Sequence, residues 1–384
     1  MSGQRINLSP THPIPSSPRR KFSKSSVIIV TRFPPGLTSA QLDICDLGQA
    51  FGVTAPCFAS ASDATLYSLL AFTAVSSQHL GNCVNDENVR ADIVARSRSA
   101  VSQIPEQDVS TNLLCGVLTW CREILSGELG TPVHLPLDGI VDLLNQCVMP
   151  FESHPMATPL YYLMLRFDLS RALADEQPLS LPLWMPLDFG QRSELATRVF
   201  HASAQALVLC GRVVNLIYGG VESTGHSESL ISQWSGLVEE LGSWYSSRPE
   251  ESKPIVEMDG KGDSFPTVLF TTGAGLLSNQ LYHTAMLLLL KNRPRTFKCV
   301  SNYKASSSMS SLWHARRICG IALANDSRGS WDPSLLASFV TAAKGMTHSA
   351  QHQMLLTRLS DIGRLTGWNV NYYWTTLRQE WGAY

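Results

Sequence analysis

The chain has 384 residues, a length that can bury a large core and allows either two or three domains or one long helical unit. Hydrophobic residues make up 44% of it and charged residues only 16%, with a formal net charge of −1. This balance excludes a protein that is drawn to nucleic acid or to an anionic membrane by its overall charge. A charge-poor chain rich in Ser and Leu instead favours mostly buried helices.

Residues 1–40 differ from the rest of the chain, because they are rich in Pro and Ser and contain no acidic residue. Such a segment buries too little apolar surface to offset the entropy of ordering it, so we expect disorder. It contains a compact basic cluster made up of Arg19, Arg20, Lys21 and Lys24. This cluster is a candidate nuclear-import signal or phosphate-contacting tail, and a simple solvated basic tail is the alternative.

Nine cysteines are scattered along the chain, at positions 45, 57, 83, 115, 121, 147, 210, 299 and 319. Their odd number and apolar neighbours favour buried, reduced thiols in an intracellular protein over a disulfide framework. A structural zinc site needs closely spaced Cys or His pairs, and the chain has no CxxC. His348 and His352 share a helix face but lack the Glu of a metalloprotease helix, so we expect an exposed polar pair and no metal.

Apolar spacing predicts helices almost without interruption from Asp63, which we expect to cap a helix that reaches Leu80. Another helix is expected over 111–125. At Thr158-Pro159 an N-cap hydroxyl precedes a proline at the first helical position, and Asp332-Pro333 repeats this pattern. Strand patterns of useful length are missing.

The run 230–245 carries Trp234, Leu237, Leu241 and Trp244 at spacings of three, four and three, which predicts one apolar stripe of an amphipathic helix. Gly367 is expected to end a later helix. We therefore predict an all-α fold: one large domain of packed antiparallel helices over 41–384, preceded by the disordered basic segment 1–40.

A long uncharged stretch lies between Asp263 and Lys291. A membrane span needs roughly 20 predominantly apolar residues, and this stretch is interrupted by Thr, Ser, Asn, Gln and His side chains. We expect a buried core helix here and no contact with a membrane.

The run 225–229, Gly-His-Ser-Glu-Ser, nearly matches the nucleophile elbow of a hydrolase, but Ser229 replaces its last glycine. The preceding run 213–218 suits either a strand or the continuation of a helix from Glu194. Without strands elsewhere a hydrolase sheet is not expected, so an esterase that uses Ser227 is a minor alternative and we predict that the protein is not an enzyme.

A series of landmarks follows in order along the chain. They are Arg166 and Asp168 within the run 165–169, Trp234, Trp244, Pro249, Pro266, the runs 279–289 and 314–322, Trp368 and Trp381. Over roughly residues 60–384 these landmarks resemble the fungal-specific transcription factor domain, the middle homology region of fungal binuclear zinc-cluster transcription factors.

The resemblance implies a helical domain that modulates transcription in a nuclear protein, through partner contacts or an effector. Family members usually carry a six-cysteine zinc cluster near the N-terminus, and that cluster reads DNA. Here the first cysteine is Cys45 and no such spacing occurs up to Cys121, so direct DNA binding by this chain is not expected. Either an upstream exon encodes the cluster, or the protein acts through partners without one.

The landmark residues also have a purely structural interpretation, which we favour over ligand contact. Trp234 and Trp244 are expected to pack in the core. Arg166 and Asp168 are two residues apart on a helix, so they point in different directions and should bond to different helices.

The leading hypothesis is a transcription-regulator-like protein in the nucleus, with the cytoplasm as the alternative location. It would control a metabolic gene set, including secondary metabolism, without a cofactor of its own. Its expected partners are other transcription regulators or a second copy, and a small-molecule effector is a further candidate. The main alternative is an effector-binding helical module with no role in transcription.

Overall fold

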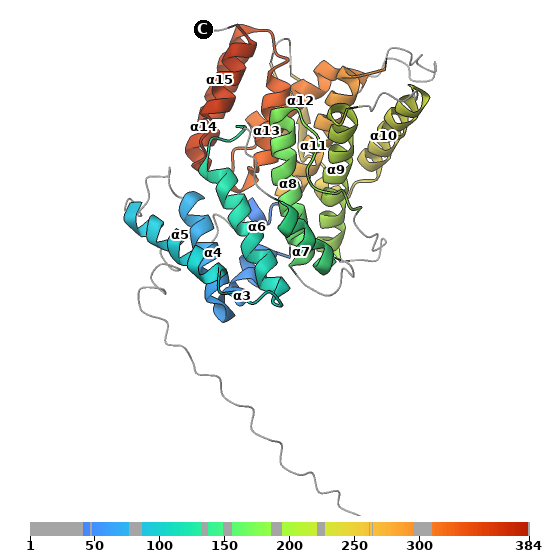
Figure 1. The fold of residues 1–384 in the computed structure, drawn as a ribbon. Helices are drawn as coiled ribbons and strands as arrows, with labels where there is room; N and C mark the ends of the chain where they lie inside the picture. The colour runs from blue at the N-terminus through green and yellow to red at the C-terminus, as the bar shows by residue number, and fades with distance from the viewer. Residues whose placement is uncertain are drawn as a thin grey trace, which may run out of the picture. The chain divides into compact units, whose positions relative to one another are not determined.

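The computed structural model describes residues 41–46, 48–76, 87–131, 137–148, 156–185, 194–220, 227–260, 262, 264–294 and 309–382. All of them lie within the compact unit Gly36–Tyr384. Over these ranges the chain forms thirteen α-helices and one two-stranded sheet, which confirms the predicted all-α class (Figure 1). The segment 1–40, with its basic cluster, lies outside the described residues.

The helices are α3 (Ala55–Ala61), α4 (Asp63–Ser76), α5 (Glu87–Val101), α6 (Val109–Ser126), α7 (Asp138–Val148), α8 (Ala157–Asp175), α9 (Leu195–Tyr218), α10 (Ser227–Ser247), α11 (Gly273–Lys291), α12 (Ser311–Ala324), α13 (Pro333–Ala343), α14 (Ser349–Thr366) and α15 (Asn371–Glu380). The strands are β1 (Val256–Met258) and β2 (Thr267–Leu269), and a short π-helical turn, Ala50–Thr54, leads into α3.

Several helix ends follow directly from local chemistry. The Asp332 carboxylate accepts a hydrogen bond from the Ser334 amide at 2.9 Å, with Pro333 at the first helical position of α13, as predicted. Gly367 ends α14 in the left-handed conformation, with φ of 77°, which also confirms the prediction.

Two predicted caps are displaced. Helix α8 begins at Ala157, because the Met156 carbonyl already accepts the Leu160 amide at 2.9 Å, so Thr158 lies inside the first turn. At the start of α4 the Ser62 hydroxyl, one residue before the predicted Asp63, accepts the Thr65 amide at 3.4 Å. Helix α4 is described as far as Ser76, so its predicted end at Leu80 lies outside the described residues.

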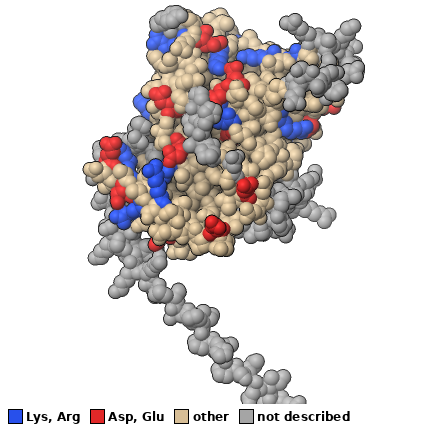
Figure 2. Space-filling view, viewed as in Figure 1, with Lys and Arg blue, Asp and Glu red and all other residues tan. Residues whose placement is uncertain are grey.

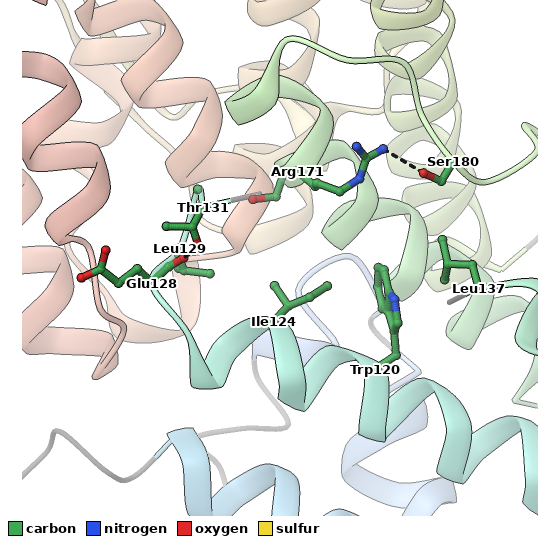
Figure 3. Close-up of a pocket in the computed structure, with 10 residues that line it drawn as sticks. Trp120, Ile124, Glu128, Leu129, Thr131, Leu137, Arg171 and Ser180 are labelled. Carbon is green, nitrogen blue, oxygen red and sulfur yellow. Dashed lines mark hydrogen bonds between the residues drawn. The ribbon is translucent and has the colours of Figure 1, made fainter. Parts of the chain in front are cut away.

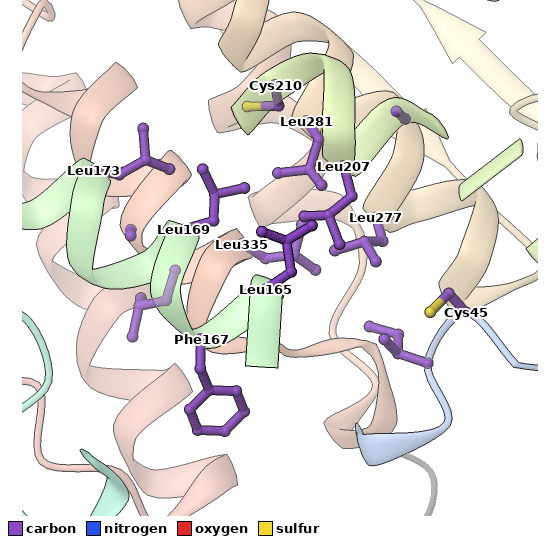
Figure 4. Close-up of a cluster of buried hydrophobic side chains, with 14 of the residues drawn as sticks. Cys45, Leu165, Phe167, Leu169, Leu173, Leu207, Cys210, Leu277, Leu281 and Leu335 are labelled. Atoms are coloured by element: carbon purple, nitrogen blue, oxygen red, sulfur yellow. The ribbon is translucent and has the colours of Figure 1, made fainter. Parts of the chain in front are cut away.

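Helices α8 and α11 form the interior of the domain. In α8, 14 of 19 residues are buried, and in α11, 16 of 19 are, so each is covered on nearly all sides. The uncharged stretch that was predicted to be a core helix contains the buried helix α11, whereas its first part, 264–272, is not helical and includes strand β2. Figure 4 shows leucines of α8 meeting Leu207 of α9, Leu277 of α11 and Leu335 of α13.

The predicted tryptophan stripe holds α10 against both of its neighbours. The Trp244 indole donates to the Ala202 carbonyl of α9 at 2.9 Å, and the Trp234 indole donates to the Leu289 carbonyl of α11 at 2.9 Å. The first bond joins the end of α10 to the start of α9, and the second joins the start of α10 to the end of α11. Helix α10 therefore runs antiparallel to both neighbours. Helices α9 and α11 run parallel, since Ser203 bonds to the Ala274 carbonyl near both starts.

Helix α9 is long and apolar enough to cross a membrane by length and composition alone. Within the described residues it is the one helix of this kind, and 61% of its most apolar window is buried inside the domain.

The small sheet was not predicted, because strands of three residues are too short to show alternation. Strands β1 and β2 pair antiparallel, with Glu257 opposite Val268. The Asn325 side chain at the end of α12 attaches this hairpin to the helices: its amide donates to the Val268 carbonyl at 2.8 Å, and its oxygen accepts the Phe270 amide at 3.1 Å.

Gly320 of α12 lies directly against the loop that precedes β2. A Cβ atom at this position would lie 2.1 Å from the Pro266 carbonyl oxygen, which belongs to backbone that cannot easily move. We expect Gly320→Ala to lower the free energy of unfolding by about 1–3 kcal/mol. The matched control is Gly242→Ala in α10, where a Cβ meets nothing within 4 Å; it should raise the free energy of unfolding by up to about 1 kcal/mol.

Urea denaturation of both variants provides the measurement. Equal effects of the two substitutions would contradict the close packing of α12 on the hairpin loop.

Candidate functional site

The landmark residue Arg166 lies at a buried junction of three parts of the chain. Its side chain is 1% exposed, and its Nη1 atom lies 3.0 Å from Oδ2 of Asp332, the N-cap of α13. The guanidinium also donates to the backbone carbonyls of Gln41 and Leu42, at 3.2 and 2.6 Å. One cation therefore joins α8, the start of α13 and residues 41–42, which precede the π-helical turn.

Asp43 continues this junction. Its two carboxylate oxygens accept the Phe51 and Gly52 amides of the π-helical turn at 2.9 and 2.8 Å. Burial raises the pKa of Asp43 to about 6, because the loss of water outweighs these two hydrogen bonds and the nearby charge of Arg166.

Asp168 has a separate set of partners. Its carboxylate accepts from Arg171, one turn along α8, at 3.0 and 2.9 Å, and from the amides of Ser180 and Leu181 at 2.7 and 2.9 Å. Arg166 and Asp168 therefore act apart, as the structural interpretation expected. Asp168, however, binds its own helix and the loop after it, whereas we had expected another helix.

A pocket of about 90 Å³ lies between α6, α8 and the loop after α6 (Figure 3). Its lining residues are Trp120, Ile124, Glu128, Leu129, Gly130, Thr131, Leu137, Ser170, Arg171 and Ser180. We call it the α6–α8 pocket. It lies beside the Asp168–Arg171 ion pair, since Arg171 takes part in both.

The α6–α8 pocket offers hydrogen-bond donors in a partly apolar space. The Trp120 indole N–H, which lines the pocket, is buried without a hydrogen-bond partner among the described residues. Tyr373 packs on Gly130, whose φ of +93° and lack of a Cβ allow this close approach. The volume corresponds to about three water molecules at ~30 Å³ each, so the pocket suits a small polar group.

A second polar cluster was not predicted from the sequence. His283 of α11 and His314 of α12 are both buried, and their Nδ1 atoms lie 2.8 Å apart, so one ring donates to the other. The rings of Tyr245, Tyr282 and Trp313 surround His283. Burial lowers the pKa of His283 well below its usual 6.5, and the neighbouring His314 lowers it further.

The remaining landmarks occupy structural positions. Pro249 precedes the short helical turn Glu250–Ser252, Pro266 packs on Gly320, and Trp368 is buried. The Trp381 indole donates to the Ala343 carbonyl at 3.2 Å.

The residues considered as metal ligands or as a nucleophile do not form such a site within the described ranges. His352 stacks on Trp381, with ring centroids 3.9 Å apart, and was wrongly predicted to be half of an exposed pair. No group of three or more His, Cys, Asp or Glu residues that could hold a metal occurs within the described ranges. The run 213–218 belongs to α9 and is not a strand; the residues 221–226 and the side chain of Ser227 lie outside the described residues.

Six cysteines have described side chains, and all six are free thiols. Five are buried, as predicted, whereas Cys57 is exposed. Cys83, Cys147 and Cys299 lie outside the described side chains.

Some of these partners could have been found from the sequence and others could not. Arg171 follows Asp168 by three residues on a predicted helix, which is a spacing that favours an ion pair. Asp332 is 166 residues from Arg166, and nothing in one sequence links the two. The histidine pair joins two helices whose contact depends on the tertiary fold.

On the face shown in Figure 2, basic and acidic side chains are interspersed and most of the surface carries neither. No protein-family model, curated protein or solved structure matched this chain.

The raised pKa of Asp43 predicts a specific pH dependence. Between about pH 4 and 6 the folded state binds more protons at Asp43 than the unfolded state does, so the contribution of this residue to the free energy of unfolding falls as the pH rises. Asp43→Asn removes the titrating group. The stability of the wild type relative to this variant should therefore drop by up to about 3 kcal/mol from pH 4 to 7.

Urea denaturation of both proteins at several pH values measures the difference. A difference that stays constant, or that grows with pH, would contradict the burial of this carboxyl group.

Proposed function

We propose that this chain is a transcription-regulator-like protein of the nucleus, and that its all-α domain controls a metabolic gene set, including genes of secondary metabolism. It acts through contacts with other regulators or with a second copy of itself. The family resemblance of the ordered landmarks is the basis of the proposal.

One observation supports it most directly: landmarks that are far apart in the sequence join different helices of one framework. Arg166 connects α8 to α13, and Trp234 and Trp244 connect α10 to α11 and α9. Pro266 packs on α12 through Gly320, and Trp381 bonds to the end of α13. A domain family needs residues of this kind at fixed positions, because they set how its helices pack.

A tethered reporter tests the proposal. The full chain is fused to an unrelated sequence-specific DNA-binding domain, and transcription from a promoter with that domain's site is measured. The expected result is a change in reporter transcript relative to the DNA-binding domain alone, and loss of that change in the Arg166→Met variant, whose framework is broken. A reporter that does not respond to the wild-type fusion would count against the proposal.

The nuclear location is tested separately through the basic cluster. Joint replacement of Arg19, Arg20 and Lys21 by Ala should shift a fluorescently tagged full chain toward the cytoplasm. The matched control replaces Arg5 and Arg32, two isolated cations of the same segment, and should leave the distribution unchanged. Equal distributions for the two variants would contradict the import role.

A second candidate function is that of an effector-binding helical module without a role in transcription. The α6–α8 pocket favours it, because a buried donor at Trp120 has no partner among the described residues. This alternative predicts ligand-dependent thermal stabilisation of the chain together with a silent tethered reporter.

A further inference from the structure

The two last helices form a groove that no step of the proposed function uses. Helix α14 contributes one face to it, with residues spaced three and four apart, namely Ser349, His352, Gln353, Leu356, Thr357 and Ser360. Trp374 and Arg378 of α15, and Trp381 just after it, form the opposite wall. The groove has a volume of about 540 Å³, within the range of roughly 300–1,000 Å³ that is usual for small-molecule sites. We call it the α14–α15 groove; Figure 1 shows both helices.

Aromatic rings form its walls and are held in place before any ligand binds. The His352 ring lies flat on Trp381, with an angle of 4° between the planes. Nε2 of His352 donates to the Met346 carbonyl at 2.7 Å, and the Trp381 indole donates to Ala343. Both rings are therefore fixed by hydrogen bonds outside the groove. Half-buried flat rings of this kind favour a flat, apolar ligand body.

One cation in the groove has no counter-ion among the residues that the structure describes. The Arg378 guanidinium lies over the Trp374 ring, 4.7 Å from its centroid, and has no hydrogen bond or ion pair within the described part of the chain. None of the nine lining residues is acidic. An Arg fork that stacks on an aromatic ring and keeps its N–H groups free is well suited to bind a carboxylate through two hydrogen bonds.

We propose that the α14–α15 groove binds a small aromatic carboxylate. The aromatic body packs against the exposed parts of Trp374 and Trp381, and the carboxylate pairs with Arg378. The groove would bind such a ligand whether or not the chain regulates transcription.

A protein partner fits the groove less well. A stable protein interface uses about 20–30 residues on each side, whereas nine residues line this groove. One unpaired cation matches one carboxylate, and a volume of this size accommodates one small molecule.

Calorimetric titration of the full chain tests the proposal with two probes of nearly the same shape, indole-3-acetate and the neutral indole-3-acetamide. The acetate should bind the wild type at least about tenfold more tightly than the amide, because only the acetate forms a charged pair with Arg378. This comparison needs no variant and so does not depend on how a variant folds.

Two variants locate the site. Arg378→Gln should reduce the ratio of the acetate affinity to the amide affinity to near one. The matched control Arg364→Gln should leave this ratio unchanged, since Arg364 is an exposed residue of α14 outside the groove. Trp374→Ala should weaken both probes.

Three results would overturn the proposal. They are equal affinity for acetate and amide in the wild type, equal loss of acetate binding in the two arginine variants, and capture of an acidic aromatic peptide without any measurable binding of either probe.

Discussion

Replacing Arg166 by Met should lower the free energy of unfolding by about 3–5 kcal/mol. The substitution keeps an unbranched apolar stem but leaves the Asp332 carboxylate, 2% exposed, without its cation. The carbonyls of Gln41 and Leu42 lose their donors at the same time. Asp332 retains its hydrogen bonds from the Ser334 amide and hydroxyl, which places the cost below that of a wholly isolated charge.

The matched control for this experiment is Arg364→Met. Arg364 pairs with Asp361 on the surface of α14 and is 79% exposed, so its loss should cost no more than about 1 kcal/mol. The double variant Arg166→Met with Asp332→Asn should be less destabilised than the sum of the two single variants, because the second change removes the stranded charge. An Arg166→Met effect as small as that of the control would contradict the junction described here.

The second large loss of stability is expected when Trp244 is replaced. Trp244→Ala should lower the free energy of unfolding by about 3–5 kcal/mol, since it removes a large side chain from the core. Trp244 is 2% exposed, stacks with Tyr282 at 5.8 Å and donates to the Ala202 carbonyl. The loss affects both neighbours of α10 at once.

Two further variants separate the contributions at this position. Trp244→Phe keeps most of the apolar volume and loses the indole N–H, so its effect should be near 1 kcal/mol, roughly the net value of one hydrogen bond. Trp374→Ala removes a half-buried tryptophan at the domain surface and should cost clearly less than Trp244→Ala. Equal costs for Trp244→Ala and Trp374→Ala, measured by urea denaturation, would contradict the core position of Trp244.

The features that could be predicted from the sequence are those with a local cause. The stripe with Trp234 and Trp244 follows from helical periodicity, and Asp332-Pro333 and Gly367 mark helix ends through their own backbone chemistry. Each involves residues only a few positions apart.

The features that could not be predicted depend on packing between distant segments. The partner of Arg166 comes from a helix 166 residues later, and the His283–His314 pair forms only because α11 lies on α12. The α14–α15 groove shows the same limit. The three- and four-residue spacing of its lining residues on α14 is visible in the sequence. The position of the aromatic wall opposite depends on how α15 packs against α14.

Thr158 illustrates a different kind of failure. Its hydroxyl and the following proline are a common helix start, yet α8 begins earlier, because the packed residues Met156 and Ala157 extend the helix by one bond. Tertiary burial outweighed a local preference of about 1 kcal/mol at this position.

Transcript abundance in the cells that express this chain tests the proposed role in transcription. The comparison is between cells that lack the chain, cells in which the wild type is restored, and cells in which Arg166→Met is restored. We predict that transcripts of a defined metabolic gene set change when the chain is lost, return to normal with the wild type and do not return with Arg166→Met. Unchanged transcripts in cells that lack the chain would contradict a role in transcription.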